Sequence, residues 1–221
     1  MSDLAQRLGH DFAQPALLRQ ALTHPSTADG PTDSYERLEF LGDRVLGLIV
    51  ADLLIARFPR EPEGALARRL AALVRREALA EVARGLELGA HLALARPERQ
   101  AGEDDNPALL ADACEAVIGA LYLDGGLKAA RAFVEPLWRP RLEADARPPQ
   151  DPKTELQEWA QGRGLPLPDY DEIGRSGPAH EPLFTVQVRV QGEAPEQGEG
   201  RSKRQAEQQA AERLLARIKI R

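Results

Sequence analysis

Acidic residues recur at helical spacing between residues 35 and 50. Glu36, Glu39 and Asp43 follow the pattern i, i+3 and i+7, which places them within roughly 60° of one another on one helix face. Such a run is often a solvated surface, but here the same face continues with Leu46 and Val50, and the other faces are apolar as well. This pattern favours a helix inside its domain, where carboxylates need protons, cationic partners or metal ions.

A second acidic pair, Asp112 and Glu115, lies in the apolar stretch L-L-A-D-A-C-E-A-V-I-G-A-L-Y. Its i, i+3 spacing again places both carboxylates on one face of an interior helix. We expect the two helices to contribute to one shared site. Ligands that are all oxygen favour Mg²⁺ or Mn²⁺ over Zn²⁺. Glu63 stands near the start of another helix, where the helix dipole alone explains an acid.

Three prolines in the stretch D-A-R-P-P-Q-D-P divide the chain of 221 residues into two parts. The stretch predicts a linker over residues 146–152, between domains at residues 1–145 and 153–221. Apolar residues recur at helical spacing throughout the first domain, which predicts an all-α fold. The expected helices cover residues 4–8, 15–22, 35–58, 63–86, 107–123 and 127–143.

The second domain has a different pattern. Residues 153–161 are predicted to form a helix, and L-F-T-V-Q-V-R-V at 183–190 alternates as a half-buried strand does. Weaker strand patterns cover 169–175 and 191–200, and a long helix is expected over 201–220. The order is α-β-β-β-α, so the second domain is predicted to be α+β and the chain multidomain.

Composition and charge narrow the location and the partners. No apolar run approaches the roughly 20 residues of a membrane span, and the N-terminus lacks the pattern of a secretory signal. A single cysteine, Cys114, excludes a disulfide framework and a cysteine-rich zinc site. We therefore expect a cytoplasmic protein with no membrane partner. The net charge of −6 argues against nucleic acid only until the charges are located, because residues 201–221 hold seven basic and two acidic side chains.

The stretch E-R-L-E-F-L-G-D-R-V-L-G-L at residues 36–48 resembles the signature of the bacterial ribonuclease III family. The resemblance extends to T-H-P-S at 23–26, to L-V-R at 73–75 and to the D-x-x-E-x-x-x-G pattern of residues 112–119. The tail, with D-P-K-T-E-L-Q-E-W and S-K-R-Q-A-E-Q-Q-A-A, resembles a double-stranded RNA-binding domain. The resemblance implies a homodimeric endonuclease that cuts double-stranded RNA with Mg²⁺, for which Mn²⁺ substitutes, and with no small-molecule cofactor.

The resemblance also implies roles by position. Asp43 and Glu115 would be the catalytic pair, and together with Glu39 and Asp112 they would bind the metal. Cleavage would leave 5′-phosphate and 3′-hydroxyl ends with short 3′ overhangs, in ribosomal RNA precursors and structured messenger RNAs. The residues that match substrate-contacting or supporting positions of the family are Glu36, Glu63, Gln157, Glu158, His180, Lys203 and Arg204.

Two other classes of protein remain open on the sequence alone. A catalytically silent regulator could bind double-stranded RNA with the same fold, but such a relative should lose metal ligands first, and all four carboxylates are present. A helical metal enzyme could act on another phosphate ester and use the tail as a tether. The basic final helix and the strand pattern make RNA the better substrate.

Overall fold

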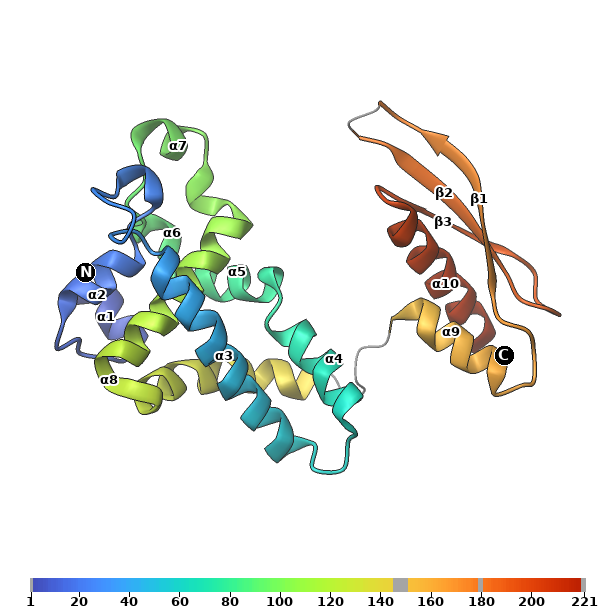
Figure 1. The fold of residues 1–221 in the computed structure, drawn as a ribbon, viewed down its shortest axis with the longest axis horizontal. Helices are drawn as coiled ribbons and strands as arrows, with labels where there is room; N and C mark the ends of the chain where they lie inside the picture. Colours follow the sequence, from blue (N-terminus) through green and yellow to red (C-terminus); the bar gives the residue numbers. More distant parts are fainter. Residues whose placement is uncertain (1, 145–150, 179–180, 220–221) are drawn as a thin grey trace. The chain divides into compact units, whose positions relative to one another are not determined.

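The computed structural model describes residues 2–144, 151–178 and 181–219. The chain divides into two compact units, residues 1–149 and 150–221. The first unit is helical, and the second combines two helices with a three-stranded sheet (Figure 1), so the predicted fold class is confirmed. Most of the predicted linker, residues 146–150, lies outside the described residues.

Two long helices organise the helical unit. Helix α3 (Glu36–Arg57) packs chiefly against α8 (Pro107–Ala144), and α5 (Arg76–Gly85) and α2 (Pro15–Ala21) also pack on α8. Apolar side chains of α3 and α8 are the centre of a single buried cluster. The remaining elements are α1 (Ser2–Leu8), η1 (Pro25–Thr27), α4 (Glu63–Leu73), α6 (Leu88–His91), α7 (Arg96–Gln100) and η2 (Glu103–Asp105).

Helix α3 lies inside the unit on one side only. Leu46 and Ile49 are fully buried, as the apolar pattern predicts. On another face, however, Phe40, Leu48 and Ile55 are 57–68% exposed. The expectation of an interior helix is therefore wrong for this face, and an apolar strip along α3 remains uncovered in the single chain.

The helix expected over residues 63–86 is wrong as one element. The structure has two helices there, α4 and α5, and they are separated at Val74 and Arg75. The physical reason is a tertiary contact, because the indole N–H of Trp138 donates a hydrogen bond of 2.9 Å to the carbonyl of Leu73. In an unbroken helix that carbonyl would accept from an amide of the next turn.

Glycine explains the interruption expected between residues 123 and 127. Element α8 spans residues 107–144, but it consists of two helices that meet at a kink, where Gly126 has φ 69° and ψ −170°. This conformation is outside the helical region and is readily accessible only to glycine. The two helices predicted from the sequence are therefore confirmed, and they meet at a kink at Gly126.

Glycines also allow α3 and α8 to approach each other closely. A Cβ atom at Gly42 would overlap the carbonyl oxygen of Glu115, and one at Gly119 would overlap the carbonyl oxygen of Leu38. The two backbones are therefore in direct contact where the helices cross. Because this contact involves Glu115 itself and lies one turn from Glu39, it sets the spacing of the acidic side chains.

The second unit is an antiparallel sheet packed against two helices. Its elements are α9 (Pro152–Gln161), β1 (Asp169–Ser176), β2 (Leu183–Arg189), β3 (Glu196–Gly200) and α10 (Lys203–Lys219), with strand order β1-β2-β3. Val188 of β2 and Leu214 of α10 are fully buried in its core. Gly198 and Gly200 leave room for the backbone of α10, since a Cβ atom at either position would collide with it.

We expect the substitution Gly42→Ala to destabilise the helical unit by at least about 3 kcal/mol, because the added methyl group meets backbone rather than a flexible side chain. Urea denaturation followed by circular dichroism measures this change. The matched control is Gly85→Ala, a helical position where an added Cβ has nothing within 4 Å, and it should be neutral or slightly stabilising. Equal stability of the two variants would contradict the close helix contact.

Candidate metal centre and nucleic-acid interface

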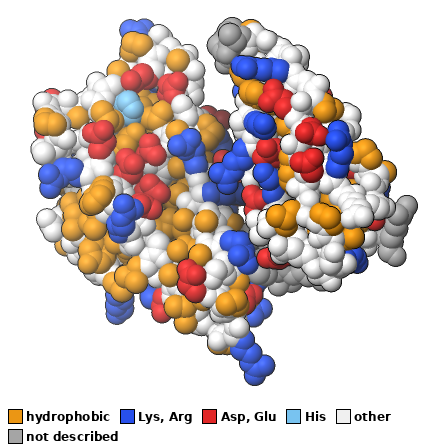
Figure 2. Space-filling model, turned by 45° about the vertical axis from the view of Figure 1, so that its right-hand side comes forward, with side chains coloured by type: hydrophobic (Ala, Val, Ile, Leu, Met, Phe, Trp, Pro, Cys, Tyr) orange, Lys and Arg blue, Asp and Glu red, His pale blue; other side chains and the backbone are white. Residues whose placement is uncertain are grey.

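Three carboxylates meet where α3 crosses α8. Glu39 comes from α3, and Asp112 and Glu115 come from successive turns of α8. One oxygen atom of each residue lies within 4.8 Å of the others, and all three side chains are partly buried. Acidic side chains gather on one face of this unit, with basic side chains near them (Figure 2). We call these three residues the acidic cluster.

The acidic cluster is electrostatically strained. Burial, followed by the charges of Glu39 and Asp112, raises the pKa of Glu115 to about 7. Burial and the charges of Asp112 and Glu36 raise the pKa of Glu39. Burial also raises the pKa of Asp112, although the charges of Arg76 and His24 lower it in part. A divalent cation would relieve both the repulsion and the loss of solvent. The donor set, which consists only of oxygen, fits Mg²⁺ or Mn²⁺.

Tyr35 lies beside the acidic cluster and was not singled out in the sequence. Its side chain is 4% exposed, and burial together with the charges of Asp112 and Glu39 raises its pKa. The phenol therefore stays protonated and can only donate or accept as a neutral group. The sequence signal was its position directly before Glu36, but an aromatic residue there is equally typical of the core.

Asp43 lies apart from the acidic cluster. Among the described residues, the cluster consists of Glu39, Asp112 and Glu115, while the carboxylate of Asp43 is paired with the guanidinium of its neighbour Arg44. Arg44 also lies over the ring of Phe40, 5.4 Å from its centroid. The structure thus brings together three of the four carboxylates expected to bind metal.

Glu36 and Glu63 have different surroundings. Glu36 is exposed, accepts a hydrogen bond of 3.0 Å from the hydroxyl of Ser34, and is close enough to Glu39 to raise its pKa. Glu63 is exposed and begins α4, as an acid favoured by the helix dipole would. Among the described residues, neither belongs to the acidic cluster of this chain.

The candidate RNA-binding residues are on two helices of the second unit. Gln157 and Glu158 are exposed on α9, and Lys203 and Arg204 are exposed at the start of α10. The Ser202 hydroxyl accepts a hydrogen bond of 3.2 Å from the amide of Gln205 and so caps α10. The ammonium of Lys203 is 3.9 Å from the carboxylate of Glu172. His180 lies outside the described residues.

Comparisons with known proteins match both units. A family described as "Ribonuclease-III-like" matches residues 14–141, and one described as "Double-stranded RNA binding motif" matches residues 152–218. Ribonuclease 3 of Rhodopseudomonas palustris is 53% identical over 216 residues, which are 97% of this chain and 79% of that protein. Ribonuclease 3 of Azorhizobium caulinodans is 54% identical over 97% of this chain and 92% of that protein. The chain belongs to the ribonuclease III family.

A solved structure extends the likeness to the fold. The nuclease domain of ribonuclease III from Campylobacter jejuni aligns with a TM-score of 0.60 and 37% identity, and the alignment covers 64% of this chain and 97% of that one. The aligned share of this chain corresponds to the length of the helical unit. Membership of the ribonuclease III family confirms the expected enzyme class, an endonuclease that hydrolyses double-stranded RNA. Within the described residues, no helix has the length and apolar content to cross a bilayer.

The pKa of Glu115 predicts how stability depends on pH. It is about 7 in the folded protein against 4.5 for an unperturbed glutamate. The folded state therefore binds more protons between these values, and the stability contributed by protonated Glu115 is lost as the pH rises through about 7. Without divalent cation, we expect Glu115→Gln to be more stable than the parent by about 2 kcal/mol near pH 8, and by much less near pH 5.

Chemical denaturation with chelator at both pH values measures this difference. The control is Glu143→Gln, an exposed acid on the same helix, which should change stability by less than about 0.5 kcal/mol. Millimolar Mg²⁺ near pH 8 should reverse the order of parent and Glu115→Gln, because only the parent offers the full charge to the cation. If Glu115→Gln raised the free energy of unfolding by the same amount at both pH values, the raised pKa of Glu115 would not be the cause of the change.

Proposed function

We propose that the acidic cluster binds Mg²⁺, or Mn²⁺ in its place, and that each of the two such sites in a homodimer cuts one strand of double-stranded RNA. The observation that carries the proposal is the meeting of Glu39, Asp112 and Glu115 with raised pKa values on a face of the helical unit. Bound there, a divalent cation supplies Lewis acidity and an activated water for phosphodiester hydrolysis. The products would be 5′-phosphate and 3′-hydroxyl ends with short 3′ overhangs.

Each acidic residue has a separate role in this proposal. Glu39, Asp112 and Glu115 hold the cation, since their crowding favours the deprotonated state only when positive charge is present. Asp43 would leave its ion pair with Arg44 and bind the cation instead. It can reach the cation because it follows Glu39 by about one turn of the same helix. Asp43 and Glu115 are the catalytic pair. Glu36 and Glu63 contact substrate or support the site, each from an exposed position.

The second unit is proposed to bind the RNA through its shape. Lys203 and Arg204, exposed at the start of α10, would pair with phosphates across the major groove. Gln157 and Glu158 on α9, together with His180, would reach 2′-hydroxyl groups of the minor groove. The substrates expected from the family are ribosomal RNA precursors and structured messenger RNAs, and the proposed location is the cytoplasm.

We also propose that the enzyme is a homodimer. The exposed apolar strip of Phe40, Leu48 and Ile55 along α3 supports this, because a second copy would remove it from water. The related structure from Campylobacter jejuni is described as having a region involved in dimer formation of the nuclease domain. Sedimentation equilibrium tests the proposal, and a monomer at micromolar concentration would contradict it.

Asp43→Asn should lower cleavage of a long RNA duplex by at least about 100-fold in Mg²⁺ while leaving duplex binding nearly unchanged. End-labelled duplex RNA measures the rate, and single-stranded RNA, duplex DNA and chelator are the negative controls. The matched substitution is Asp52→Asn, an acid on the same helix that pairs with Arg131 at 2.6 Å and should cut at nearly the parent rate. Binding without cleavage by the parent would instead support the silent RNA-binding regulator.

Replacing Lys203 and Arg204 by alanine should weaken duplex binding by about 10-fold or more near 0.1 M salt, because two phosphate contacts are lost. The slope of log affinity against log salt should become shallower by about one unit for each contact. Fluorescence anisotropy over a salt series measures both quantities. Replacing Arg213 and Lys219, farther along the same helix, removes equal charge and should leave the slope nearly unchanged.

A further inference from the structure

The helical unit contains a cavity that the proposed function does not use. It is formed by the end of α3, by α4 and α5, and by the end of α8, which can be followed in Figure 1, and its volume is about 340 Å³. Its apolar lining includes Leu54, Phe58, Ala72, Leu73, Ala78 and Leu142. The lining shares no described residue with the acidic cluster. A mostly apolar cavity of this volume with a few polar groups is typical of a small-molecule site.

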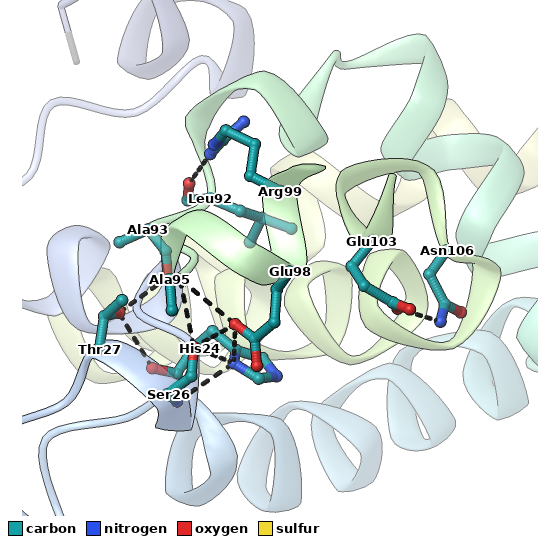
Figure 3. A network of polar contacts seen from close by, with 10 residues as sticks. All are labelled: His24, Ser26, Thr27, Leu92, Ala93, Ala95, Glu98, Arg99, Glu103 and Asn106. Atoms are coloured by element: carbon teal, nitrogen blue, oxygen red, sulfur yellow. Dashed lines mark hydrogen bonds and ion pairs between the residues drawn. The ribbon is translucent and has the colours of Figure 1, made fainter. Parts of the chain in front are cut away.

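A second cavity of the same unit, beside the turn at His24, is less suited to a ligand because its polar groups contact protein. Nδ1 of His24 lies 2.9 Å from the hydroxyl oxygen of Ser26, and that hydroxyl donates to the carboxylate of Glu98. The side-chain amide of Asn106 donates to Glu103. Figure 3 shows these contacts. The cavity at the end of α3 differs, because its basic side chains outnumber its acids.

Three arginines and one acid, Glu81, line the cavity at the end of α3. Arg69 is 3% exposed and donates two hydrogen bonds of 2.8 Å to the carboxylate of Glu61. Its guanidinium also lies over the ring of Phe58, 3.8 Å from the centroid. Arg69 and Glu61 therefore form a fixed part of the wall, in which each charge is compensated by the other.

The other two arginines differ in how firmly they are held. Arg141 donates to the carbonyl of Leu137 at 2.9 Å and to the carboxylate of Glu81 at 3.4 Å. The side chain of Arg75 is 63% exposed, and it lies 3.8 Å from the carboxylate of Glu77, which is exposed as well. Such an exposed pair contributes little free energy and separates easily. Arg75 is therefore the guanidinium that can turn toward an incoming anion.

We propose that this cavity binds an apolar carboxylate, with the carboxylate group on Arg75 and the hydrocarbon body against Leu54 and Leu142. A guanidinium pairs with a carboxylate through two parallel hydrogen bonds. Because Glu61 and Glu81 compensate two of the three arginines, the cavity has one positive charge in excess, which matches a monoanion. The apolar wall would remove the hydrocarbon body from water. The inference goes beyond the proposed function and does not depend on it.

Isothermal titration calorimetry of the full chain with butanoate, hexanoate and octanoate, each below its micelle concentration, tests the proposal. We expect the affinity to rise about 4-fold for each added CH₂ group until the cavity is filled. Octan-1-ol, which has the same chain without the charge, should bind at least about 10-fold more weakly than octanoate. A parallel titration with 2-naphthoate distinguishes a cavity that takes a ring from one that takes a chain.

Two substitutions with matched controls locate the binding. Arg75→Gln should weaken binding of octanoate by about 10-fold and leave octan-1-ol unchanged, because only the charged contact is lost. Its control is Arg68→Gln, an exposed arginine of α4 outside the lining, which should bind octanoate as the parent does. Ala72→Phe should fill the cavity and abolish binding of both compounds, whereas Ala71→Phe, at the exposed neighbouring position, should not.

Circular dichroism shows whether each variant is folded, and if Ala72→Phe is not, the comparison of Arg75→Gln with Arg68→Gln decides. Octanoate binding that is unchanged in Arg75→Gln would overturn the inference. The absence of binding by both octanoate and 2-naphthoate at millimolar concentration would overturn it as well. Cleavage of duplex RNA by the same preparation tests the proposed function separately, so that the two failures are distinguishable.

Discussion

The direct contact between the backbones of α3 and α8 is the constraint on which the nuclease unit depends. Gly42 and Gly119 each lack the one carbon atom that would separate the helices. Because Glu115 contributes its own carbonyl to this contact, side chains one turn away on either helix must project from the same crossing point. The acidic cluster is thus a consequence of helix packing, and the apolar core around it supplies the free energy that holds the acids together.

That arrangement has an electrostatic cost, and the cost is what makes the site suitable for a cation. Partly buried carboxylates lose solvent and repel one another, which is why the pKa of Glu115 rises to about 7. Nearby basic groups offset this only in part. Arg76 and His24 lower the pKa of Asp112, and Arg44 lowers the pKa of Glu115. Without a divalent ion the carboxylates repel one another, and in the proposed function a bound cation would make the same acids its ligands on a rigid support.

The charge distribution reconciles an acidic protein with an RNA substrate. The sequence carries a net charge of −6, yet exposed Lys203 and Arg204 begin α10 in a unit that matches a double-stranded RNA-binding motif. The acids of the nuclease unit are concentrated where metal ions would neutralise them.

The sequence by itself determined the α and α+β units, most helix limits, and the two acidic helix faces from which the acidic cluster is drawn, because spacing along a helix decides which side chains share a face. Only the tertiary structure decided that Asp43 pairs with Arg44, that Phe40 and Leu48 stay exposed, and that Trp138 ends α4 by bonding Leu73. These features depend on partners distant in the chain or on competition between neighbours, which periodicity does not encode. The surroundings of His24 likewise required Ala93 and Glu98 to be brought to it by the fold.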